Sequence, residues 1–115
     1  MAGWRLYKWV QPFETPDECR RVASTLSEKI GYTPEPKSDQ IVSISKSELI
    51  KIVVVEWGKL TAVQVAYASQ NGSPLLKKIN TILGAPGESE TLLESIPVRN
   101  YMGPKIERRV VTPVF

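Results

Sequence analysis

The fold of this chain is decided by residues 49–69, whose sequence is LIKIVVVEWGKLTAVQVAYAS. Two runs rich in β-branched residues flank Gly58-Lys59, a dipeptide that suits a type II′ hairpin turn because glycine accepts a positive φ. A two-residue loop fixes the register of the hairpin, so Trp57 is expected opposite Leu60 and Lys51 opposite Ala66. The stretch therefore predicts a long antiparallel hairpin at the centre of a sheet.

The two faces of this hairpin differ in character, because successive side chains of a strand point to opposite sides. One face carries Ile50, Ile52, Val54, Val63, Val65 and Tyr67. That face is apolar enough to be core. The other face combines Trp57, Lys51 and Gln64 with small apolar residues. It is expected to be either a second core layer or a platform on which a planar group lies.

Composition limits the class of protein. The 115 residues make one domain, 1–115, with 42% hydrophobic and 23% charged residues, which indicates a globular chain. The net charge of +3 permits nucleic-acid binding without demanding it. One cysteine and no histidine exclude an intrachain disulfide framework and a Cys/His zinc site, so no cofactor is expected.

The first residues, Met1 to Arg5, lead into charged positions, and no apolar run approaches the length of a membrane span. We therefore expect a soluble, cytoplasmic protein with no membrane partner.

The flanking segments predict strands and helices on either side of the hairpin. Residues 4–13 alternate as a strand that Pro12 ends or confines to a sheet edge. Thr15-Pro16 begins a helix that Gly31 ends, and residues 41–46 form a short strand. Ser73-Pro74 repeats the cap-plus-proline signal, for a helix that Gly84 ends.

After the second helix the pattern weakens. Residues 89–95 suggest a helical turn with Leu92 and Leu93 inward, and residues 96–115 suggest one or two strands broken at Gly103-Pro104. Helices beside an antiparallel sheet predict an α+β fold of two layers, in which the helices pack on one face of the sheet.

The sequence offers little for an enzyme. Histidine, the commonest acid or base near neutral pH, is absent, and Cys19 lies on the apolar stripe of the first helix, where a buried structural role is the simpler reading. The glycine-rich and nucleophile motifs of common enzyme classes are missing. We expect a binding protein rather than an enzyme.

Aromatic residues interleaved with cations favour binding of single-stranded nucleic acid. Flat rings stack on bases while cations follow the phosphates, whereas duplex DNA hides its base faces. Stretch 4–9, the hairpin tip and stretch 99–109 each combine the two residue types. The expected binding residues are Arg5, Tyr7, Lys8, Trp9, Lys51, Trp57, Lys59, Arg99, Tyr101, Lys105, Arg108 and Arg109. If Arg5, Tyr7 and Trp9 lie on the same side of the sheet as Lys51 and Trp57, they form one groove.

The same three stretches carry a resemblance to a known family. A short α+β chain with the N-terminal run WRLYKW, a long Val/Ile hairpin containing Trp57, and the basic segment Arg99 to Arg109 resembles the ThermoDBP-related single-stranded DNA-binding proteins of thermophilic archaea. The resemblance covers the general character of the chain and includes no short diagnostic motif. It implies a sheet packed on helices, with an aromatic cleft, edged by basic residues, that binds single-stranded DNA with little sequence preference.

Two other functions stay open. One is an RNA-binding or ribonucleoprotein accessory protein that uses the same surface. The sequence does not distinguish it from a DNA-binding protein, because RNA is recognised by contacts with its 2′-OH, and no sequence pattern predicts such contacts. The other is a structural subunit whose aromatic sheet face is a protein interface. The longer members of the resembled family carry a C-terminal leucine zipper. The tail of this chain contains Pro104 and Pro113 and has no heptad pattern. The oligomeric state of the family therefore cannot be transferred to this chain, and a homodimer is one of the open alternatives.

Overall fold

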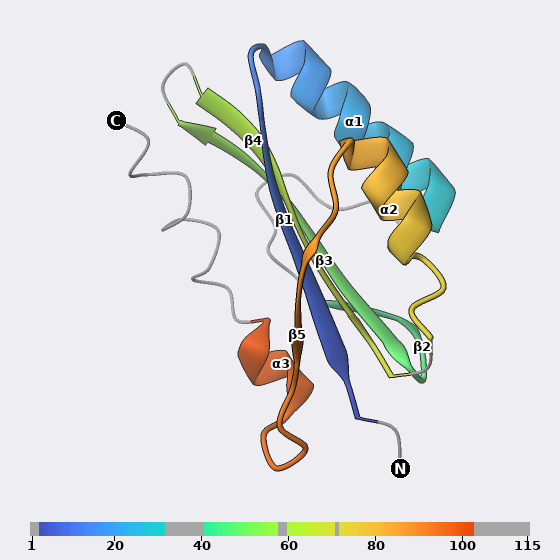
Figure 1. Cartoon of the computed structure of the whole chain (residues 1–115). Coiled ribbons are helices and arrows are strands. Elements are labelled where there is room, and N and C mark those ends of the chain that lie inside the picture. Colours follow the sequence, from blue (N-terminus) through green and yellow to red (C-terminus); the bar gives the residue numbers. More distant parts are fainter. Residues whose placement is uncertain (1–2, 32–40, 58–59, 71, 103–115) are drawn as a thin grey trace.

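The computed structural model describes residues 3–31, 41–57, 60–70 and 72–102, with the backbone alone for residues 55–57 and 60 (Figure 1). The described elements are, in chain order, β1 (Arg5–Phe13), α1 (Pro16–Ile30), β2 (Val42–Ser45), β3 (Glu48–Trp57), β4 (Leu60–Ser69), α2 (Leu76–Leu83), β5 (Glu88–Thr91) and α3 (Val98–Tyr101). The strands form one antiparallel sheet in the order β2-β3-β4-β1-β5, and the predicted α+β class is confirmed.

The central hairpin has the expected register. β3 pairs with β4 so that Trp57 lies opposite Leu60 and Lys51 opposite Ala66. The turn dipeptide itself lies outside the described residues. β4 is the middle strand, because β1 returns from the N-terminus and pairs along its other edge, with Phe13 opposite Thr61 and Arg5 opposite Ser69.

Helices α1 and α2 pack together on the apolar face of the hairpin, as Figure 1 shows. The Thr15 side chain accepts a hydrogen bond from the Glu18 N–H at 3.2 Å, so α1 begins at the predicted cap. Gly31, with a φ of 81°, ends α1 in the left-handed conformation that favours glycine. The core between these layers joins three groups of buried side chains: Ile50, Ile52, Val63, Val65 and Tyr67 of the hairpin, Cys19, Ala23 and Leu26 of α1, and Ile79 and Leu83 of α2.

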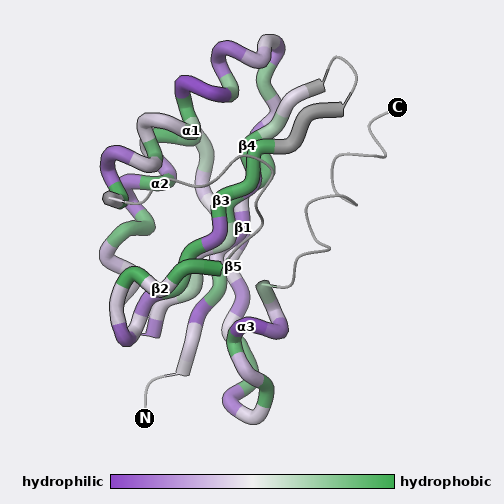
Figure 2. Tube along the Cα trace, turned by 180° about the vertical axis from the view of Figure 1, so that it is seen from behind, coloured by the Kyte–Doolittle hydropathy of each residue, from purple (hydrophilic) through white to green (hydrophobic). Residues whose placement is uncertain are grey.

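The second face of the sheet is a second core layer rather than an open platform. Its hairpin residues Leu49, Lys51, Val53, Ala62, Gln64, Ala66 and Ala68 are all buried. Leu92 and Met102 pack on this face with Leu6. Figure 2 shows α3 on the side of the sheet away from α1 and α2, so the helices are not all on one face.

Two predicted helical segments are corrected. The second helix begins at Leu76 rather than at Ser73-Pro74. Ser73 has a φ of 53°, and its hydroxyl donates to the Tyr7 hydroxyl at 3.0 Å. The side chain that was expected to cap the helix therefore makes a tertiary hydrogen bond instead.

Within the segment predicted as a helical turn, residues 89–91 belong to strand β5, which pairs with residues Arg5 to Lys8 of β1, and residues 92–95 belong to none of the described helices or strands. Strand pairing here overrides a weak local helical signal, and it buries Leu92 while leaving Leu93 63% exposed. Within the tail, residues 98–101 form α3 in place of the predicted strand, and 103–115 lie outside the described residues. Among the described helices, none has the length and apolarity needed to cross a membrane.

Tyr67 ties the hairpin to the start of α2. Its side chain is fully buried, its hydroxyl donates to the Glu48 carboxylate at 2.6 Å, and it accepts from the Leu75 N–H at 3.3 Å. Burial, and after it the bond to Glu48, raises the pKa of the Tyr67 phenol well above its ordinary value of about 10. The protonated phenol therefore contributes its full stabilisation at pH values below its ordinary pKa. This contribution is lost as the pH rises towards the raised pKa of the folded protein.

We expect Tyr67→Phe to lower the free energy of unfolding by about 1–3 kcal/mol at neutral pH, because Glu48 and the Leu75 N–H both lose a partner. Urea unfolding measures the difference. Tyr101→Phe is the matched control: the Tyr101 hydroxyl accepts a hydrogen bond from the Leu93 N–H at an exposed position. A smaller loss for Tyr67→Phe than for Tyr101→Phe would contradict this assignment.

Candidate functional site

The residues that were predicted to form one groove lie on two different faces of the sheet, because of the way β1 pairs with β4. Trp9 lies opposite Val65 and Tyr7 opposite Tyr67, so both rings share the face that packs against the helices. Lys51 points to the other face, opposite Ala66. The condition for a single groove is therefore not met.

The rings of Tyr7 and Trp9 are core side chains. Trp9 is 4% exposed, and Tyr7 stacks on Tyr67 with ring centroids 6.1 Å apart. Neither ring offers a free face to a base, which corrects the stacking role expected for them. Alternation shows which side chains of a strand share a face, but it does not show which face of the sheet the helices cover.

The two lysines of this region lie on the second face in one cross-strand row, in which Ala66 stands between Lys8 and Lys51. Lys8 is partly exposed, and its ammonium lies 3.7 Å from the Glu90 carboxylate. Lys51 is only 3% exposed, and its ammonium donates to the Met102 carbonyl at 2.6 Å. Lys8 is thus the more accessible of the two cations.

Among the remaining predicted residues, those that the structure describes with their side chains lie on different elements. Arg5 is exposed at the beginning of β1, Arg99 is exposed on α3, and Tyr101 is half-buried beside it. Trp57 belongs to β3, but its side chain lies outside the described residues. Lys59, Lys105, Arg108 and Arg109 also lie outside them.

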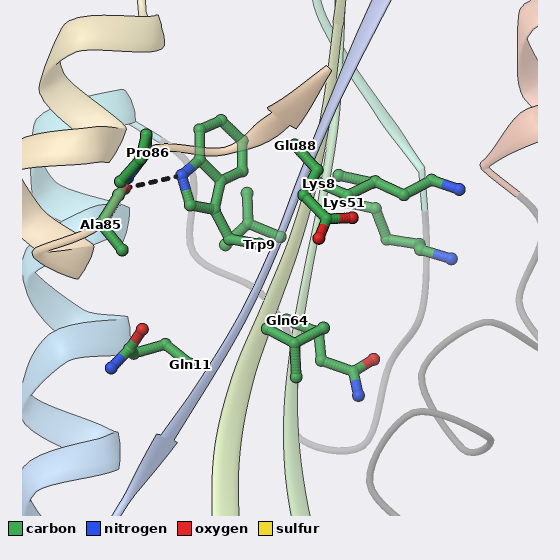
Figure 3. Close-up of a pocket in the computed structure, with 11 residues that line it drawn as sticks. Lys8, Trp9, Gln11, Lys51, Gln64, Ala85, Pro86 and Glu88 are labelled. Carbon is green, nitrogen blue, oxygen red and sulfur yellow. Dashed lines mark hydrogen bonds between the residues drawn. The ribbon is translucent and has the colours of Figure 1, made fainter. Parts of the chain in front are cut away.

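A cleft of about 400 Å³ runs along β1 and is here called the β1 cleft. It is lined by Lys8, Trp9, Val10, Gln11, Lys51, Gln64, Val65, Ala66, Ala85, Pro86 and Glu88. Figure 3 shows Trp9 on one side of β1, and Lys8, Lys51 and Gln64 on the other. The predicted binding residues include three of these residues, Lys8, Trp9 and Lys51. Val10, Gln11 and residues 85–88 were missed, because tertiary contacts bring residues 85–88 to β1.

Trp9 holds the wall of this cleft in place. Its indole N–H is shared between the Asn80 side-chain oxygen, at 3.0 Å, and the Ala85 carbonyl, at 3.1 Å. Figure 3 shows the bond to Ala85. The same Asn80 oxygen accepts from the Gly87 N–H at 3.1 Å. The end of α2 and the loop after it are thereby fixed against the helix-facing side of β1.

The β1 cleft mixes charge with apolar surface. Lys8 and Lys51 face it together with one carboxylate, Glu88, and its remaining polar side chains are the amides Gln11 and Gln64. In the part of the chain that the structure describes, no cluster of three or more acidic or cysteine side chains could hold a metal ion. The arrangement suits a ligand with both an anionic and a flat apolar part.

Comparison of the chain with protein-family models, with curated protein sequences and with solved structures returned no match.

Gly87→Ala tests the wall of the cleft. A Cβ at this position would lie 2.5 Å from the Trp9 ring, and the ring is held by two hydrogen bonds. We expect a loss of about 1–3 kcal/mol in the free energy of unfolding, measured with urea. Gly3→Ala is the control, because its nearest contact would be an ordinary 3.7 Å. Equal stability of the two variants would mean that the loop does not pack on Trp9.

Proposed function

We propose that the protein binds single-stranded nucleic acid, DNA foremost, with little sequence preference, and that the β1 cleft is the centre of the binding site. The observation that supports this best is the row formed by Lys8, Ala66 and Lys51. Neighbouring strands lie about 4.8 Å apart, so the two lysine backbones are separated by roughly 10 Å across a small, flat alanine. Lys51 and Ala66 are buried, so the apolar surface of the cleft beside the partly exposed Lys8 suits a base whose neighbouring phosphate meets Lys8.

Single strands fit this site better than duplex. The volume of about 400 Å³ is near the lower end of the roughly 300–1,000 Å³ range of small-ligand sites, which accommodates an unpaired base but not a helix. A duplex also keeps its base faces stacked and needs an element that fills a groove. Lys8 supplies the accessible charge, while Lys51 contributes from a buried position.

The proposal assigns stacking to Trp57 rather than to Tyr7 and Trp9. Lys59 beside it, and Lys105, Arg108 and Arg109 of the tail, stay predicted phosphate contacts. Membership of the ThermoDBP-related group and a cytoplasmic location belong to the same proposal. RNA remains an alternative ligand, because nothing in the β1 cleft selects against a 2′-OH.

A protein interface is the second candidate, and one observation favours it. Leu93 is 63% exposed and Ile96 is 38% exposed, and both border a hollow of about 120 Å³ that Trp4 also lines. Exposed apolar side chains around a hollow are typical of partner sites. Such a contact would weaken little with salt, whereas phosphate binding weakens steeply.

The binding proposal is tested by titrating fluorescently labelled single-stranded DNA, single-stranded RNA and duplex DNA at two or more salt concentrations. We expect single strands to bind more tightly than duplex and affinity to fall as salt rises. Equal or stronger binding of duplex, or no binding at low salt, would refute the proposal.

Lys8→Ala connects this binding to the cleft. Removing one phosphate contact should flatten the slope of log affinity against log salt by about 0.7 for a single strand. The fold should tolerate the change, because the partly exposed pair with Glu90 adds little stability. Lys78→Ala is the control, with the same loss of charge at an exposed position of α2 on the opposite layer. If both variants change the slope equally, the β1 cleft is not the phosphate site.

A further inference from the structure

The backbone of β1 presents an open edge inside the β1 cleft, and the direction of its polar groups can be worked out. The Trp4 carbonyl accepts from the Leu92 N–H at 3.0 Å, so the polar groups of Trp4 face β5. The Phe13 carbonyl accepts from the Thr61 hydroxyl at 3.2 Å, so those of Phe13 face β4. Because the direction alternates along a strand, the N–H and C=O of Val10, like the C=O of Pro12, point to the β5 side.

No described strand pairs with that side beyond Lys8. The ladder between β1 and β5 ends at Lys8 and Glu88. The reason is the bond network of Trp9, which holds Ala85 and Gly87 against the helix-facing side rather than in line with the sheet. Val10 is 39% exposed and lines the cleft, so its donor and acceptor face the space in which a ligand would lie.

This edge suits a compact ligand better than an added strand. Strand addition uses a run of backbone donors and acceptors, but Pro12, the next residue that faces the same way, has no N–H. The edge therefore offers one full donor–acceptor pair, at Val10. Every nucleobase carries the complement on its Watson–Crick edge, where an acceptor lies next to an N–H donor: N1 and N6–H in adenine, N3 and N4–H in cytosine, O6 and N1–H in guanine, O4 and N3–H in thymine.

We infer that the backbone N–H and C=O of Val10 bind the Watson–Crick edge of one unpaired base, while Lys8 on the same strand meets a neighbouring phosphate. This inference rests on the proposed function and adds the chemical basis of its selectivity. A backbone pair that matches all four bases tolerates any sequence. A duplex is rejected because its Watson–Crick edges are already paired.

The first test changes the ligand and leaves the protein unaltered. Oligothymidylate is compared with the same oligomer carrying N3-methylthymine, which lacks the N3–H donor and blocks the approach to the edge. We expect affinity to fall about tenfold, as for the loss of one or two hydrogen bonds. Oligodeoxyuridylate is the control, because it loses only the C5 methyl group, which lies outside the Watson–Crick edge, and it should bind within about twofold.

The second test removes the backbone donor. Val10→Pro deletes an N–H that takes no part in the ladder with β4, and proline is tolerated on strand edges. We expect Val10→Pro to bind oligothymidylate about tenfold more weakly. Val10→Ala keeps the N–H and should bind like the unaltered protein. Both variants are checked by urea unfolding. If Val10→Pro does not fold, the ligand test alone decides.

The outcomes separate this inference from the function on which it rests. Tight, salt-dependent binding of single strands that N3-methylation leaves unchanged would overturn the role of Val10 and keep the proposed function. Absence of binding by every oligonucleotide at low salt would overturn both.

Discussion

The antiparallel pairing of β1 with β4 is the interaction on which the rest of the structure depends. It places Tyr7 and Trp9 in the same cross-strand rows as Tyr67 and Val65, and so commits both rings to the helix-facing core. A shift of one residue would turn every side chain of β1 to the other face, exposing two large rings and burying Lys8 against the helices. Burial of the rings therefore determines the register, and the register determines which residues remain for a ligand.

Trp9 connects this core to the surface. Through Asn80 and Ala85 it joins β1 to the end of α2, and it draws the following loop out of line with the sheet. β5 can then pair with only the first half of β1, and the second half keeps an open edge. A hydrogen-bonded core residue thus shapes the cleft without presenting a ring face to it.

The position of Lys51 shows how this fold combines charge with a second core layer. Burying an ammonium group is costly unless it is hydrogen-bonded, and the Met102 carbonyl at the end of α3 provides a partner at 2.6 Å. This bond links the hairpin to the segment after β5, over the buried surface of Leu6, Leu49 and Leu92. The second face of the sheet is therefore closed by chain segments distant in sequence, and the accessible cation of the row is Lys8.

Local sequence determined the central hairpin, its register and the first helix of this protein. Valine and isoleucine alternation, a two-residue turn and the Thr15-Pro16 start are short-range signals, and each of them agrees with the global fold. Only tertiary structure decided the rest. The predicted helical turn over residues 89–95 gave way, at residues 89–91, to pairing with β1, and the Ser73 hydroxyl bonds to Tyr7 instead of capping a helix. Whether Trp9 lies on the same face as Lys51, and the cleft that results, depended on the pairing of β1 with β4, which are distant in sequence. The register of that pairing is determined by the burial of apolar surface between elements. The alternation of residues within one strand does not show which of its faces will be buried.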